Sequence, residues 1–142
     1  GVQTCALPIS QPKTPRFLHA DILDSAFLQS LDQLDNDQGF VAELVEIFVR
    51  ESKVILQEMA HSIRAGQRSR FTEQCQILLD NAGQLGAFAL YEMCLGLTQI
   101  DQPTFEGSAS QRHEQLSALV AQTSQAFHDY LTESQTQQTD HH

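Results

Sequence analysis

The segment around residues 71–85 most constrains the fold, because its apolar residues recur at alternating intervals of four and three positions. This spacing places the apolar side chains along one side of an α-helix, and it is typical of a helix packed inside a bundle. We therefore predict a buried helix that begins near Ser69, a good N-cap residue. Its expected core positions are Phe71, Cys75, Leu78, Ala82 and Leu85.

A second stripe predicts a long helix before it. This helix should run over about 38–65, and Gly66 should end it, because glycine readily adopts the left-handed conformation at the C′ position. The apolar positions that we expect to face the core are Phe40, Leu44, Ile47, Phe48, Ile55, Met59 and Ile63.

Three further helices complete the prediction. A short one is expected at 20–34, another at about 90–100, and a last one at about 110–132. The sequence Asp-Gln-Pro at 101–103 should stop the fourth helix, and a loop with Gly107 should precede the fifth. No segment shows the strict alternation of a β-strand. The fold class that follows is all-α: an antiparallel four-helix bundle with a short extra N-terminal helix.

Composition narrows the choice of partners. The chain has 18 Asp and Glu against 8 Lys and Arg, a formal net charge of −10. This balance repels phosphate backbones and anionic lipid, so we expect no nucleic-acid partner and no membrane contact by this domain. The three cysteines form neither a CxxC pair nor a disulfide framework, which fits a reducing cytoplasm.

The two ends of the chain differ from its body. Residues 1–9, GVQTCALPI, resemble at every codon the translation of a sequencing-library adapter, so we interpret them as an artefact and the rest as the C-terminal part of a longer protein. An ordinary leader is the alternative. Residues 10–19 contain two prolines and predict a linker. Residues 134–142 are polar and predict a disordered tail, which leaves 20–133 as the helical bundle.

Two segments resemble the histidine-phosphotransfer (HPt) domain family. Residues 75–94, CQILLDNAGQLGAFALYEMC, are similar to the HPt signature A/C-H-x-L-K-G-x-A-x-x-L/M-G-A-x-x-L. Residues 31–52 have the family's cadence LxxLxxDxxFxxELxxxFxxE. The pattern looks most like the HPt domains that end hybrid sensor histidine kinases, in a degenerate form (a pseudo-HPt). The resemblance implies a four-helix bundle of HPt type.

The register of this signature decides what the resemblance implies for the site. Gln76 stands where the family has its phosphorylated histidine, Leu79 where it has a lysine and Asp80 where it has a glycine. Gly83 keeps a small residue, and the four positions are expected to form a receiver-docking face on one side of the helix. An amide nitrogen is not a nucleophile, so the resemblance implies that phosphate is not accepted at Gln76. Leu79 is either an exposed apolar residue without a role or the centre of an altered docking surface.

Other side chains offer no replacement for the missing histidine. His61, His113 and His128 lack a lysine and small residues beside them, and we interpret them as surface residues. The terminal residues 140–142, Asp-His-His, are interpreted as solvated tail rather than a metal site, because a flexible end would lose much entropy on binding.

The expected function is that of a phosphorelay module in two-component signal transduction. The module would be non-catalytic, without cofactor or metal, and would dock a response-regulator receiver domain or another signalling protein. It would lie in the cytoplasm, alone or as the cytoplasmic end of a membrane-anchored sensor kinase. Two alternatives stay open: competition with a partner HPt protein for the same receiver, and a purely structural bundle that helps a longer kinase to dimerise.

Overall fold

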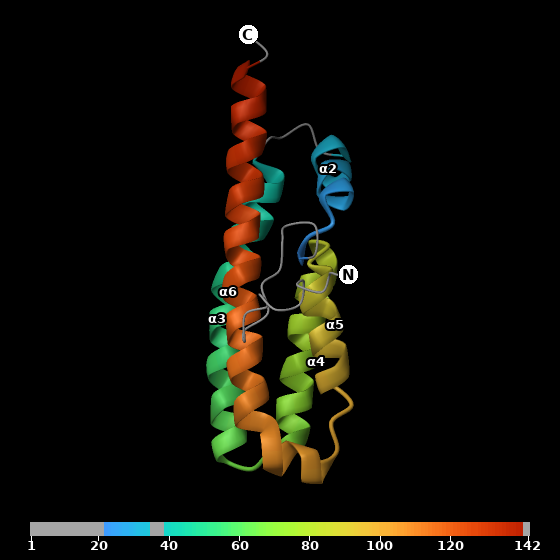
Figure 1. The fold of residues 1–142 in the computed structure, drawn as a ribbon, viewed down its shortest axis with the longest axis vertical. Helices are drawn as coiled ribbons and strands as arrows, with labels where there is room; N and C mark the ends of the chain where they lie inside the picture. Colours follow the sequence, from blue (N-terminus) through green and yellow to red (C-terminus); the bar gives the residue numbers. More distant parts are fainter. Residues whose placement is uncertain (1–21, 35–38, 141–142) are drawn as a thin grey trace, which may run out of the picture.

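The computed structural model describes residues 22–34 and 39–140, and this part of the chain is helical without a strand (Figure 1). The prediction of an all-α class is therefore confirmed. The adapter-like segment, the linker and Cys5 lie outside the described residues. No described helix is both long and apolar enough to cross a membrane. The helices are α2 (Ser25–Leu34), α3 (Phe40–Arg64), α4 (Arg68–Gln84), α5 (Phe88–Leu97) and α6 (Gln102–Asp140).

Four of these helices close into a ring. α3 packs on α4, α4 on α5, α5 on α6 and α6 on α3, and the short connections make consecutive helices antiparallel (Figure 1). α2 packs against α3. The backbone N–H of Asp24, just before α2, also donates a hydrogen bond of 3.0 Å to the carbonyl of Gly86. The start of α2 is thus fixed to the turn between α4 and α5.

The helix that was read most directly from spacing is α4. All five of its predicted core positions are buried, so this stripe is confirmed. The helix nevertheless begins at Arg68, after Gln67, and the N-cap position has no side-chain hydrogen bond. The prediction of Ser69 as N-cap is wrong, because Gln67 already directs its carbonyl to the N–H of Phe71 at 3.0 Å.

Two glycines end α3 and α4 in the same way. Gly66 and Gly86 have φ values of +69° and +70°, in the left-handed region. The N–H of the next residue bonds back in each case, from Gln67 to Ser62 at 2.9 Å and from Ala87 to Ala82 at 3.0 Å. This is the Schellman arrangement, and it confirms Gly66 as the residue that ends α3.

The buried side of α3 is rotated from the predicted stripe. Ile47 is 40 % exposed, so its assignment to the core is wrong, and Phe40, Leu44 and Ile63 are only partly buried. Two serines occupy core positions because α3 is flanked by α4 and α6, and small side chains let helices approach closely. The buried residues are Val41, Val45, Phe48, Ser52, Ile55, Met59 and Ser62.

The last helix begins earlier than predicted. Asp101 acts as its N-cap, since its Oδ1 accepts the backbone N–H of Thr104 at 2.8 Å. Pro103 falls in the first turn, where no intrahelical donor is needed, so it starts α6 rather than only stopping α5. Gly107 lies inside the helix, and the predicted loop there is wrong. The backbone of 134–140, in the predicted tail, continues α6, and 141–142 lie outside the described residues.

Candidate functional site

The outward side of α4 carries three of the four predicted docking residues. Gln76, Asp80 and Gly83 are exposed, one helical turn apart, and we call them the α4 face. The Nε2 of Gln76 donates a hydrogen bond of 3.2 Å to Oδ1 of Asp80. The amide of Gln76 is therefore held by the carboxylate of Asp80, one helical turn further along α4.

Leu79 does not belong to this face. It is 5 % exposed and forms part of the apolar core, so the prediction of an exposed residue at 79 is wrong. Position 79 lies about 60° around the helix from Gln76, one turn before Gly83. A Cβ placed on Gly83 would lie 3.5 Å from the ring of Tyr91, which shows that α5 covers this flank of α4. Leucine there is a core residue, and the altered docking surface centred on it does not exist.

The α4 face offers an amide and a carboxylate side by side. The lone pair of the Gln76 nitrogen is delocalised into its carbonyl, so it cannot attack a phosphoryl group. Asp80 brings a carboxylate next to it. The face can accept and donate hydrogen bonds, and its charge favours a cationic group on a partner.

The histidines lie elsewhere, and one of them differs from its prediction. His61 and His128 are exposed, on α3 and α6. His113 is only partly exposed, and its Nε2 lies 2.8 Å from the carbonyl of Leu56. A carbonyl can only accept, so this nitrogen carries the proton and joins α6 to α3. None of these three rings stands on the α4 face.

The two described cysteines are core residues, as predicted. Cys75 and Cys94 are free thiols with no exposed surface. Burial, and secondarily the nearby Cys94, raises the pKa of the Cys75 thiol well above its usual range. Burial raises the pKa of Cys94 to about 12. Because the thiolate is the reactive form, neither thiol is a nucleophile at neutral pH.

A row of exposed apolar side chains on α5 escaped the sequence analysis. Phe88, Tyr91 and Leu95, here called the α5 stripe, are 40 %, 37 % and 44 % exposed. The opposite side of α5 buries Leu90 and Cys94. The sequence could have indicated this row, because α5 has apolar residues around most of its circumference and cannot bury all of them against two neighbouring helices.

The α4 face and the α5 stripe belong to a segment with one sign of charge, since 71–111 contains no Lys, Arg or His. Its acidic residues include Glu73 and Asp80 on α4 and Glu92 on α5, and all three are exposed. The described basic residues all lie outside this segment. One of them, Arg68, reaches its end, where its side chain donates hydrogen bonds to the carbonyl of Ile100 and to Oε1 of Gln102, both at 3.2 Å.

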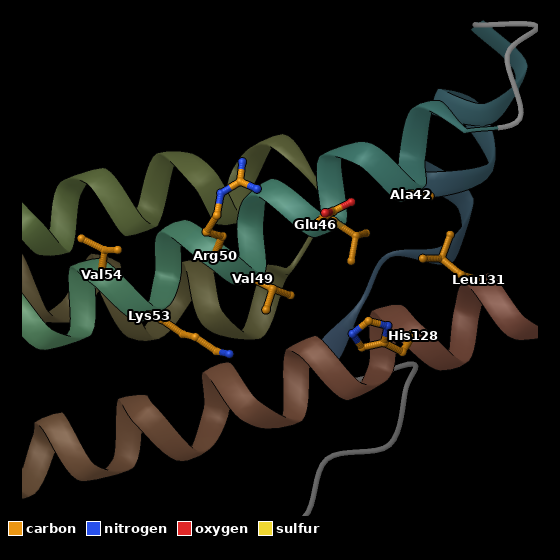
Figure 2. Close-up of a pocket in the computed structure, with 9 residues that line it drawn as sticks. Ala42, Glu46, Val49, Arg50, Lys53, Val54, His128 and Leu131 are labelled. Atoms are coloured by element: carbon orange, nitrogen blue, oxygen red, sulfur yellow. The ribbon is translucent and has the colours of Figure 1, made fainter.

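A groove on the other side of the molecule separates α3 from α6 (Figure 2). Its volume is about 620 Å³. Val49 and Lys53 of α3 and His128 and Leu131 of α6 face the gap between the two helices (Figure 2). The groove is apolar with a basic edge, but it contains no pairing of nucleophile and base. The lining residues are Ala42, Val45, Glu46, Val49, Arg50, Lys53, Val54, His128 and Leu131.

Metal binding finds no support in the described part of the chain, where no group of three or more His, Cys, Asp or Glu side chains could hold an ion. Two residues of the terminal Asp-His-His, His141 and His142, lie outside it. Comparison of the sequence and structure with models of protein families, with curated proteins and with solved structures gives no match in any of the three.

Proposed function

We propose that this chain is a phosphorelay module of HPt type that docks a receiver domain or another signalling protein without accepting phosphate itself. The observation that carries the proposal is the position of Gln76, exposed on α4 and hydrogen-bonded to Asp80. The sequence Leu-Gly-Ala at 85–87 supports the register, because Gly86 forms the left-handed turn between α4 and α5. The ring of four antiparallel helices, with a short helix before it, supports the four-helix bundle of HPt type.

The acidic character of the chain supports a protein partner. A formal charge of −10, with no basic residue in the segment 71–111, disfavours nucleic acid and anionic lipid as partners. We favour docking over transfer because the amide of Gln76 cannot attack a phosphoryl group. Such a module would compete with active HPt proteins for a receiver and would reduce the flow of phosphate through the relay.

Docking is tested by nuclear magnetic resonance titration of the isotope-labelled chain with a set of purified receiver domains, phosphorylated by acetyl phosphate. We expect at least one receiver to shift the backbone amide signals of Gln76, Asp80 and Gly83. Those of Lys53 and His128 in the groove between α3 and α6 should stay unchanged, because they lie on another side of the molecule. If no receiver shifts the signals of the α4 face, the docking proposal fails and a purely structural bundle becomes the better account.

A further inference from the structure

The α5 stripe remains exposed after α4 and α6 have packed against the rest of the helix. Phe88, Tyr91 and Leu95 follow one another at intervals of three and four, so they form a continuous row along one side. Large apolar side chains gathered in this way mark interaction sites more often than scattered ones do. Exposed fractions near two fifths leave a substantial part of each side chain for a partner.

Tyr91 is the rigid part of this row. Its ring carbons Cδ2 and Cε2 would lie 3.5 Å from a Cβ on Gly83, so the ring rests directly on α4 where the side chain is missing. An aromatic ring held in this way loses little further freedom when a partner covers it. It also joins the α5 stripe to the α4 face, since Gly83 belongs to that face.

The charges around the stripe select the partner. Glu92 lies on the same outward side of α5, one turn after Phe88, and is exposed. Asp80 lies one turn before Gly83 on α4, and no Lys, Arg or His occurs anywhere in 71–111. A ring with a carboxylate one helical turn away, as Phe88 and Glu92 are, forms a favourable place for an arginine or lysine, through cation–π contact and charge attraction.

We propose that the α5 stripe, with Glu92 and Asp80, binds a basic amphipathic helix presented by the partner protein. This deepens the proposed function, because it gives the docked protein a chemistry: apolar side chains against the α5 stripe, and cations for the carboxylates of Glu92 and Asp80. A second copy of this chain is disfavoured, since two facing α5 stripes would bring their Glu92 carboxylates together. An acidic helix is disfavoured for the same reason.

The test uses the full chain and a fluorescent peptide of about five helical turns that carries Leu on one side and Arg on the other. A second peptide has Glu in place of every Arg. Binding is followed by fluorescence anisotropy at low and at physiological salt. We expect the Arg peptide to bind and the Glu peptide not to bind.

Two pairs of variants locate the site. Glu92→Lys is matched by Glu46→Lys, which makes the same change of charge on the far side of the molecule, in the groove between α3 and α6. Tyr91→Ser is matched by Val54→Ser, another exposed apolar residue at 51 %. We expect about tenfold weaker binding for each α5 variant and less than about twofold for each control. Thermal unfolding of all four variants shows whether each is folded. If Tyr91→Ser is unfolded, the comparison of Glu92→Lys with Glu46→Lys alone tests the site.

Equal losses in Glu92→Lys and Glu46→Lys would overturn the proposal, because the attraction would then be that of net charge alone. Binding of the Glu peptide would also overturn it. The docking proposal and the basic-helix proposal can fail independently. A receiver that shifts the α4 face and binds the α5 variants as tightly as the unchanged chain would refute the basic-helix proposal and leave docking intact. If the Arg peptide binds at α5 but no receiver binds the chain, the basic-helix proposal stands and the receiver-docking proposal fails.

Discussion

Replacing Gly86 by alanine tests how α2 is fixed to the rest of the molecule. Gly86 has a φ of +70°, and a Cβ there would lie 2.8 Å from Cδ2 of Phe27 and 3.4 Å from Cβ of Asp24. The left-handed conformation costs an alanine about 1 kcal/mol. The contact with Phe27 must open by several tenths of an ångström, which adds about 1–2 kcal/mol, as in other overpacked sites. We expect the free energy of unfolding to fall by about 2–3 kcal/mol in total.

The chain provides a matched control for this change. Gly66 has nearly the same φ, +69°, but a Cβ there meets nothing within 4 Å. Gly66→Ala should therefore show the conformational part alone, about 1 kcal/mol. Urea unfolding followed by circular dichroism gives both values, and their difference measures the packing of α2 on the turn. Equal losses in the two variants would refute this reasoning, since Phe27 and Asp24 would then exert no steric constraint at Gly86.

Three further substitutions have signs that the structure fixes. Ser52 is buried and its Oγ lacks a hydrogen-bond partner, so Ser52→Ala should raise the free energy of unfolding by about 1 kcal/mol in urea titration. Ser62 donates a hydrogen bond of 3.0 Å to Gln74, so Ser62→Ala should lower the free energy of unfolding by about 1 kcal/mol. Changes of the same sign in the two variants would contradict this assignment of hydrogen bonds. Leu79→Lys should lower the free energy of unfolding by about 3 kcal/mol, because a charge would enter the core; a loss below about 0.5 kcal/mol would show position 79 to be solvated. Burial raises the pKa of Cys94 from 9.0 to about 12. Because the thiol of the unfolded chain ionises first, the contribution of Cys94 to stability is complete below pH 9.0 and is lost as the pH rises toward 12. In unfolding titrations across this range, the free energy of unfolding should therefore fall less with pH for Cys94→Ala than for the unchanged chain.

Spacing predicted α4 well because its core contacts lie on one side. Every predicted core position from Phe71 to Leu85 is buried, and Gly66 ends the preceding helix as expected. The phase of α3 could not be read in the same way, since this helix touches α4 on one flank and α6 on the other. Ser52 and Ser62 are among the buried residues of α3, and a search for large apolar residues overlooks them.

The candidate site was predicted in part. Gln76 and Asp80 are exposed as expected, but helical spacing alone could not show that Leu79 is buried. That depends on the angle at which α5 leaves the Gly86 turn, which is a property of the tertiary packing. The α5 stripe was missed because only the buried side of this helix was considered, while Phe88, Tyr91 and Leu95 lie on its exposed side.

The proposed function requires that the chain has the scaffold of an HPt domain without its phosphate acceptor. It is tested most directly by transfer of radioactive phosphate from a phosphorylated receiver to three forms of the chain. We expect no label on the unchanged chain, label on the double variant Gln76→His with Asp80→Gly, and none on Gln84→His, an exposed position at the end of α4. Leu79 is left unchanged, because Leu79→Lys is itself expected to destabilise the chain. Acid-labile label on the unchanged chain would contradict the account at Gln76, and failure of the folded double variant to accept label would contradict the HPt scaffold.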